Sequence, residues 1–247
     1  MPNAFVIGNG ESRKIFNLNL IKGKGTIYGC NAIYRDHPHI CDKIVAVNDD
    51  MFSELQQAKD KMLIPGHVQI YNRHTVPQWN YVLPNDPRSD ANRFWTGSTK
   101  KDDKQSKRLD FSKAKGSGCS ALLLACEQGH DNIFIVAFDM VGAQQWMIRD
   151  GGISTQQNNL YKDTKNYPPR SSMKAYLKFE WRYQLKQIAK KYANKNFFYI
   201  NRTEILESNY WLHSATENLK NFRYGSYADL KRVADGVAIK SIRWKSY

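Results

Sequence analysis

Length, composition and charge exclude several classes of protein. The chain has 247 residues, 41% of them hydrophobic, which is enough for one α/β domain with a sizeable core. No apolar run approaches the roughly 18 residues of a membrane span, and we expect no secretion signal. The four cysteines form no C-x-x-C pair, so we expect free thiols in a reducing cytoplasm and no structural metal site.

The net charge of +14 favours a polyanionic partner. Lysine and arginine number 37 against 23 acidic residues. Such an excess is typical of proteins that bind nucleic acid, an anionic membrane or a phosphorylated substrate, although it can also serve solubility alone. The charge therefore makes nucleic acid a candidate partner.

The chain opens on a strand pattern that ends in glycines. Residues 5–7 are apolar and are followed by Gly8, Asn9 and Gly10, after which a helix can begin. A strand, a glycine turn and a helix start form the phosphate-binding loop of many open α/β sheets. The dinucleotide pattern is incomplete because Arg13 stands where its third glycine would, and the Gly-Lys-Ser/Thr of ATP-binding loops is absent. The loop predicts a nucleotide or phosphate site, or else a plain strand-to-helix turn.

Short strands alternate with helices along the chain. The expected strands are 5–7, 26–29, 44–47, 68–71, 133–138 and 197–200, and the expected helices are 11–18, 51–62, 117–128 and 172–193. This alternation predicts an α/β fold, with a mostly parallel, Rossmann-like sheet in a single domain that spans residues 1–247. Ligands of such sheets bind beyond the carboxyl ends of the strands.

Polar side chains follow several of these strands. Asn9, Asn31 and Asn48 come after the first three, and Asp139 follows residues 133–138. An asparagine amide offers a donor and an acceptor, which suits ribose hydroxyls and base edges, although a single asparagine is also a common turn residue. The repetition predicts one crevice at this edge of the sheet.

A second glycine-rich helix start would face the same crevice. Ser117 and Gly118 open the helix expected at 117–128. The backbone N–H groups of a helix start attract anions, so this position suits a phosphate group. Ser117 could instead serve only as the helix cap.

Two segments concentrate positive charge. Residues 84–115 are polar and lysine-rich, with Lys100 and Lys101 among them, and predict a basic surface insertion or lid. In the helix expected at 172–193, five cations recur at every fourth position: Lys174, Lys178, Arg182, Lys186 and Lys190. Like charges at this spacing destabilise a helix, so the row predicts a bound anion such as DNA, or otherwise a solvated face.

Apolar side chains of the same helix, including Trp181, Leu185 and Ile188, recur every three or four residues and should face the core. Residues 209–247 mix aromatic and cationic side chains. We expect them to form a C-terminal helical and aromatic extension that packs on the domain, or that stacks on nucleic-acid bases.

The order and spacing of these motifs resemble a known enzyme family, the bacterial sialyltransferases of glycosyltransferase family forty-two, and related phage transferases. The motifs are Gly8-Asn9-Gly10-Glu11-Ser12, Cys30-Asn31, Val47-Asn48, Ser117-Gly118 and the strand that ends in Asp139. The resemblance covers the first 60 residues and residues 115–140. It implies a single Rossmann-like domain with a lid, a CMP-activated sugar as donor and no metal.

The resemblance also implies roles for individual residues. Asn9, Asn31 and Asn48 would hold the nucleotide in the crevice that Gly8 and Gly10 open. Ser117 and Gly118 would lie against its phosphate or ribose, and Asp139 would support the same crevice.

The chain departs from the family at two positions. The general-base histidine is missing from residues 158–169, and Val141 stands where the family has a phosphate-binding tyrosine. Tyr161 or Tyr167 could supply a substitute hydroxyl to the nucleotide-sugar. Candidates for the catalytic base are Asp50, Asp49 and His74.

The sequence therefore predicts a metal-independent, inverting glycosyltransferase without a cofactor, whose co-substrate is a CMP- or UDP-type nucleotide-sugar. The expected acceptor is a hydroxymethylated pyrimidine in DNA, as in phage DNA modification, because basic surfaces hold the nucleic-acid backbone. Two alternatives stay open: a sialyltransferase-like enzyme that acts on a glycan or lipooligosaccharide, and a nucleic-acid-binding module without catalysis. The pattern indicates no oligomeric state.

Overall fold

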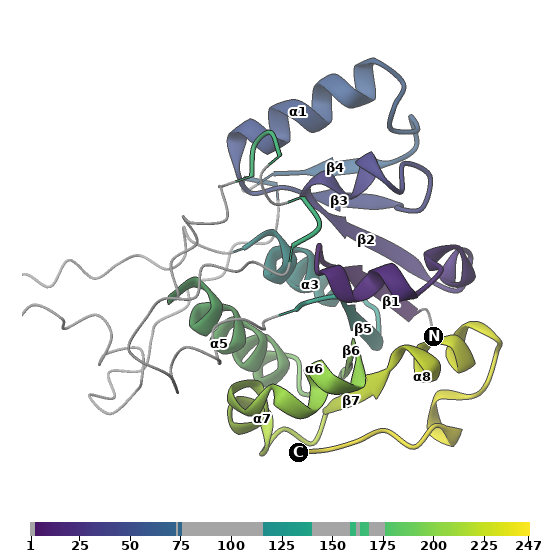
Figure 1. The fold of residues 1–247 in the computed structure, drawn as a ribbon, viewed down its shortest axis with the longest axis vertical. Coiled ribbons are helices and arrows are strands. Elements are labelled where there is room, and N and C mark those ends of the chain that lie inside the picture. The colour runs from purple at the N-terminus through teal and green to yellow at the C-terminus, as the bar shows by residue number, and fades with distance from the viewer. Residues whose placement is uncertain (1–2, 73, 76–115, 140–158, 162–163, 168–175) are drawn as a thin grey trace, which may run out of the picture.

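The computed structural model describes residues 3–72, 74–75, 116–139, 159–161, 164–167 and 176–247. Within these ranges, seven strands form one sheet: β1 (Asn3–Ile7), β2 (Thr26–Cys30), β3 (Lys43–Val45), β4 (Gln69–Tyr71), β5 (Asn132–Val136), β6 (Asn196–Asn201) and β7 (Phe222–Ser226). All neighbouring strands run parallel, in the order β4-β3-β2-β1-β5-β6-β7. The expected fold, a single Rossmann-like α/β domain, is confirmed (Figure 1).

The central strands are buried on both faces, which explains their unbroken apolar sequence. Phe5 and Ile7 of β1 belong to the core on one face, while Ala4 and Val6 belong to the core on the other. Phe5 is in register with Phe134 of β5, and their rings stack with centroids 5.1 Å apart.

Helices cover both faces of this sheet (Figure 1). One face carries the 3₁₀ helices η1 (Glu11–Ile15), η2 (Leu18–Ile21) and η3 (Asn31–Arg35), with α1 (Asp49–Asp60) and α8 (Tyr227–Ala234). The other carries α3 (Ser117–Glu127), α5 (Tyr176–Lys191), α6 (Thr203–Ser208) and α7 (Tyr210–Thr216). The helix expected at 11–18 is instead a pair of short 3₁₀ helices, and η5 (Ile239–Ser241) lies near the C-terminus.

The C-terminal part of the chain completes the sheet, a role that the expected extension packed on the domain did not include. β7 pairs with β6 along its length, so this segment supplies the seventh strand. Arg223 and Gly225 interrupt the apolar pattern of β7, so hydrophobic periodicity does not predict this strand. A β-bridge between Tyr224 and Lys245 then covers part of the outer edge of β7.

Several expectations fall on residues outside the described ranges. They include the basic insertion at 84–115, with Lys100 and Lys101, and also Lys174. Among the helices that are described, none is long and apolar enough to cross a membrane.

Candidate functional site

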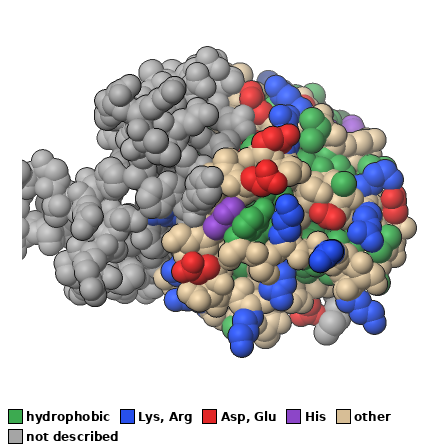
Figure 2. All heavy atoms as spheres, turned by 60° about the horizontal axis from the view of Figure 1, so that its bottom comes forward, with side chains coloured by type: hydrophobic (Ala, Val, Ile, Leu, Met, Phe, Trp, Pro, Cys, Tyr) green, Lys and Arg blue, Asp and Glu red, His purple; other side chains and the backbone are tan. Residues whose placement is uncertain are grey.

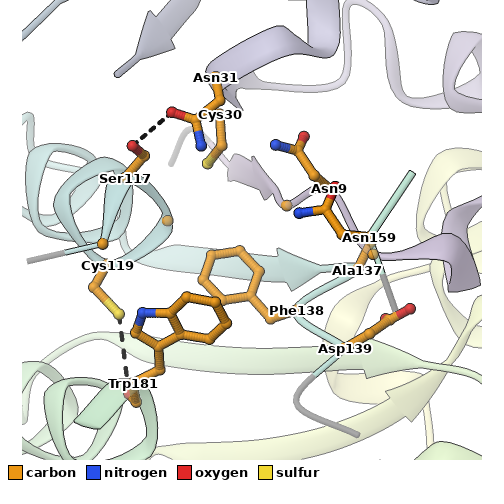
Figure 3. Close-up of a pocket in the computed structure, with 14 residues that line it drawn as sticks. Asn9, Cys30, Asn31, Ser117, Cys119, Ala137, Phe138, Asp139, Asn159 and Trp181 are labelled. Carbon is orange, nitrogen blue, oxygen red and sulfur yellow. Dashed lines mark hydrogen bonds between the residues drawn. The ribbon is translucent and has the colours of Figure 1, made fainter. Parts of the chain in front are cut away.

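A pocket lies beyond the carboxyl ends of β1 and β5 (Figure 3). From β1, the chain builds the sheet outward in one direction through β2 and in the other through β5, so the pocket lies at the switch point where such sheets bind ligands. Its walls come from five segments of the chain: Gly8–Gly10, Cys30–Asn31, Gly116–Cys119, Ala137–Asp139 and Asn159, together with Trp181 of α5.

The structure brings together most of the residues that we expected to bind a nucleotide. Those that line the pocket are Gly8, Asn9, Gly10, Asn31, Ser117, Gly118 and Asp139. They come from positions as far apart in the chain as Gly8 and Asp139, and they meet because parallel strands end at one edge of the sheet.

Asn9 has an unsatisfied hydrogen-bond acceptor. The residue is only 9% exposed, and its Nδ2 donates to the hydroxyl of Tyr167 at 2.7 Å. Its Oδ1 is buried and has no hydrogen-bond partner among the described residues. An unpaired buried acceptor costs about 1–3 kcal/mol. A ligand group that donates a hydrogen bond to this oxygen would remove that cost and so bind more tightly.

Ser117 connects the start of α3 to the ends of two strands. Its hydroxyl donates to Oδ1 of Asn31 at 2.7 Å (Figure 3). It also accepts from the backbone N–H of Val47 at 3.1 Å. The N-cap of α3 is Gly116, which makes no side-chain cap bond, so the cap interpretation of Ser117 is wrong. Asn31 has a positive φ of 51°, a conformation that asparagine tolerates better than most residues.

The N-terminus of α3 also borders the pocket. The first backbone hydrogen bond of the helix runs from the N–H of Ser120 to the carbonyl of Gly116 at 3.0 Å. In the first turn of a helix, here at Ser117 and Gly118, the backbone N–H groups have no acceptor within the helix, and the dipole of its 11 residues adds positive potential there. This arrangement is suited to an anion such as a phosphate group.

Two aromatic rings form another wall of the pocket, those of Phe138 and Trp181 (Figure 3). A glycine lies beside each of them, and a side chain at either position would displace a ring. A Cβ at Gly118 would lie 2.7 Å from Phe138, and a Cβ at Gly116 would lie 2.7 Å from Trp181. The helix start can therefore approach both rings, whose faces are suited to stacking against a nucleobase.

Asp139 fastens the loop after β1 to the rest of the sheet. Its carboxylate accepts hydrogen bonds from the backbone N–H of Ser12 at 2.7 Å, from the Ser12 hydroxyl, and from Nδ2 of Asn201 at 3.0 Å. Burial raises the pKa of Asp139 above its usual value, and these hydrogen bonds oppose that rise. These contacts link the loop after β1 to the residues that follow β5 and to the last residue of β6.

Asn48 does not line the pocket, which corrects the prediction that it would. It is exposed and caps α1, where its side chain accepts from the N–H groups of Asp50 at 2.9 Å and Met51 at 3.2 Å. Asp49 and Asp50 occupy the first helical turn, a position that favours acidic residues.

The candidate bases lie away from the pocket walls. Asp49 and Asp50 are exposed on α1, and His74 is exposed after β4, where its N–H donates to Asn72 at 2.9 Å. Within the described ranges, none of the three lines the pocket, so the structure does not support their assignment as general base.

The two tyrosines also differ from expectation. Tyr161 is buried beside the pocket, where its hydroxyl accepts from Arg13 at 2.7 Å and donates to Asp36. Tyr167 does not line the pocket, but its hydroxyl is hydrogen-bonded to two residues that do, Asn9 and Asn31. Neither ring is part of the pocket wall.

The row of cations on α5 is not one exposed stripe. Arg182 is buried at 5% exposure, Lys186 is half-buried, and Lys190 is exposed. Burial lowers the pKa of Lys186. The side chain of Lys178 lies outside what the structure describes. On the face shown in Figure 2, lysines and arginines are interspersed with acidic side chains.

Some pocket residues were missed at the sequence level: Cys30, Gly116, Cys119, Ala137, Phe138, Asn159 and Trp181. Most of them adjoin a predicted residue in the chain, so extending each motif by one or two positions finds them. Trp181 follows the core periodicity of its helix and is packed against the core as well as exposed to the pocket. Asn159 has no local signal.

The described residues contain no group of three or more His, Cys, Asp or Glu side chains that could hold a metal ion. Comparisons with family models, with curated proteins and with solved structures found no match to this chain.

Proposed function

We propose that the pocket binds the nucleoside phosphate of a nucleotide-sugar and that the protein is a glycosyltransferase. The observation that carries this proposal is the convergence of the Asn9 and Asn31 amides on the N-terminus of α3 at the switch point of the sheet. A phosphate needs N–H donors, a ribose needs polar partners and a base needs an apolar face. The three kinds of group occur together in this pocket.

Each wall suits one part of a nucleotide. The amides at the start of α3 would hold the phosphate, and the rings of Phe138 and Trp181 would contact the base. The Oδ1 of Asn9 would accept a hydrogen bond from a hydroxyl or amino group. The resemblance to family forty-two predicts nucleotide contacts at Asn9, Asn31, Ser117 and Gly118, which line the pocket, and at Asn48, which does not.

Sugar transfer requires stabilisation of the departing phosphate and removal of a proton from the acceptor. The positive end of α3 would provide the first, because negative charge builds up on the leaving group as the glycosidic bond breaks. Asp139 is already held by Ser12 and Asn201, so it is suited to support rather than to proton transfer. We therefore assign no general base.

For the acceptor, we favour a hydroxymethylated pyrimidine in DNA. The net charge of +14 supports this choice, since it would attract the phosphate backbone. A glycan acceptor is the competing possibility, and a protein that binds nucleic acid without catalysis is a third.

Nucleotide binding is tested first, by thermal shift with CMP, CDP, UDP and GDP. Ligands that bind only the folded state raise its melting temperature. We expect at least one of the four to do so, and Asn9→Ala to remove most of the shift. Asn218→Ala is the matched control, because Asn218 is exposed and lies away from the pocket walls. Absence of a shift with all four nucleotides would contradict the proposal.

Catalysis is tested by incubation with CMP-, UDP- and GDP-sugars together with DNA that contains hydroxymethylcytosine. The DNA is then digested to nucleosides for mass spectrometry, and a lactoside is offered in parallel. A glycosylated nucleoside supports the DNA acceptor. A modified lactoside alone supports a glycan acceptor, and no product with either leaves a binding module as the better explanation.

A further inference from the structure

A short segment of the chain borders the pocket and contains Tyr167. We call residues 159–161 and 164–167 the strap. It begins with an antiparallel β-bridge between Gly10 and Asn159, and the N–H of Leu160 donates to the carbonyl of Asn9 at 2.9 Å. The strap is therefore joined to the backbone of the loop that follows β1.

An ion pair between a buried arginine and an exposed aspartate holds the first part of the strap. Arg13 is 2% exposed, and its Nη1 lies 3.0 Å from a carboxylate oxygen of Asp36. Its Nη2 donates to the hydroxyl of Tyr161 at 2.7 Å, and Tyr161 in turn donates to Asp36. These three side chains fix the position of Tyr161.

A second ion pair holds the other part. Arg35 lies 2.6 Å from Glu54 and donates to Oγ1 of Thr164 at 2.7 Å and to the carbonyl of Lys165 at 2.9 Å. Asn166 donates to the same Glu54 carboxylate at 2.7 Å. The backbone immediately before Tyr167 is therefore fixed by contacts to η3 and α1.

The hydroxyl of Tyr167 is hydrogen-bonded to Asn9, which lines the pocket. It accepts from Nδ2 of Asn9 at 2.7 Å and from the backbone N–H of Ala32 at 3.5 Å. The amide nitrogen of Asn9 is thereby occupied. The atom of that amide left without a partner among the described residues is the acceptor, Oδ1.

We infer that Tyr167 is a positioning residue: by holding the nitrogen of the Asn9 amide, it leaves Oδ1, which is buried at the pocket wall, as the acceptor for a ligand group that donates a hydrogen bond. A sugar hydroxyl or the amino group of a base satisfies this requirement, whereas an ionised phosphate oxygen does not. The inference rests on the proposed nucleotide site.

The first test needs no ligand. The side-chain NH₂ signals of Asn9 in a ¹⁵N–¹H spectrum are identified by their loss in Asn9→Ala. In Tyr167→Phe we expect these signals to shift and to exchange faster with solvent, because their acceptor is gone. The ring is retained, so its packing against Tyr161, with centroids 5.6 Å apart, should persist. Tyr71→Phe is the control, since that hydroxyl donates to Gln69 at an exposed position. Unchanged Asn9 signals in Tyr167→Phe would overturn the inference.

The second test uses calorimetry with three nucleotides. CMP carries both the ribose hydroxyls and the cytosine amino group. 2′,3′-Dideoxy-CMP lacks the hydroxyls, and UMP lacks the amino group. We expect Tyr167→Phe to weaken CMP binding about five- to tenfold, the size of one hydrogen bond. Most of the effect of Tyr167→Phe should disappear in the Asn9→Ala background, because the inference has Tyr167 act mainly through Asn9.

The relative affinities for these nucleotides identify the ligand group that donates a hydrogen bond to Asn9. The nucleotide that lacks the donating group, either 2′,3′-dideoxy-CMP or UMP, should bind more weakly than CMP. This loss should be larger for the wild-type protein than for Asn9→Ala. Equal losses in both proteins, or additive effects of the two substitutions, would overturn the positioning role while leaving the nucleotide site intact. If the wild-type protein binds none of CMP, CDP, UDP and GDP, the proposed function and this inference both fail.

Discussion

The most direct test of the loop geometry is the substitution Gly10→Ala. A Cβ at this position would lie 2.2 Å from Cγ of Asp139 and 2.5 Å from each of its carboxylate oxygens. Contacts below 3.0 Å require something to move. The residue that would have to move is held by the backbone and hydroxyl of Ser12 and by the amide of Asn201.

The expected cost follows from this constraint. An added methyl group in a close-packed site costs about 1–3 kcal/mol. Displacing a carboxylate from its donors adds roughly 1.5–3 kcal/mol for a charge-assisted bond that is lost, part of which the chain recovers by relaxing. We expect Gly10→Ala to lower the free energy of unfolding by about 3 kcal/mol. At roughly 2–4 °C per kcal/mol for a chain of this size, Tm should fall by about 6–12 °C.

Urea unfolding followed by circular dichroism measures this change. Gly66→Ala is the matched control, because a Cβ there meets no heavy atom within 4 Å and its φ is not positive. We expect the control to remain within about 1 kcal/mol of the wild-type protein, or to be slightly more stable. A loss below about 1 kcal/mol in Gly10→Ala would refute the view that Asp139 is fixed against the loop.

Three further variants test other contacts. Burial acts to raise the pKa of Glu54, but hydrogen bonds from its neighbours, Arg35 among them, lower it below its ordinary value of 4.5. The ionised carboxylate therefore stabilises the fold above pH 4.5. In urea unfolding, Glu54→Gln should be less stable than the wild-type protein at neutral pH, and this difference should shrink as pH falls below 4.5. A difference that does not depend on pH between about 3 and 7 would contradict this. Trp244→Ala removes a ring whose centroid is 4.5 Å from that of Phe198, so we expect a loss of about 2–4 kcal/mol by the same method, and wild-type stability would show that the C-terminal segment is dispensable. Ser117→Ala deletes a hydroxyl with two hydrogen bonds and should cost about 1–2 kcal/mol and weaken nucleotide binding in calorimetry; a variant equal to wild type in both would contradict the role given to Ser117.

The strand ends were predictable from the sequence, but the distance of each strand from the switch point was not. Asn9 and Asn31 follow β1 and β2, which are adjacent at the centre of the sheet, and both line the pocket. Asn48 comes after β3, one strand farther out, where α1 begins at once. An asparagine after a strand is the local pattern of a ligand residue and of a helix cap alike, so only the position in the sheet distinguishes them.

Contacts between distant parts of the chain left no local pattern to find. Ser12 and Asp139 are 127 residues apart, and Arg13 and Tyr161 are 148 apart. Each member of these pairs stands in a segment that, taken alone, reads as a turn or a helix start. β7 was missed for a different reason: the pairing with β6 overrides the weak strand pattern of its own sequence.

The side chain that breaks the dinucleotide pattern also explains where a phosphate should bind. In dinucleotide-binding folds, the third glycine allows the first helix to pack closely on the sheet, with the pyrophosphate at the N-terminus of that helix. Here Arg13 occupies that position with its guanidinium buried against Asp36, and the element it belongs to is the five-residue 3₁₀ helix η1, too short for a strong dipole. The 11-residue α3 stands on another wall of the same pocket with its N-terminus open to it. We therefore expect a phosphate at α3 rather than at the loop after β1, an arrangement that fits a nucleotide with one or two phosphates better than an extended dinucleotide.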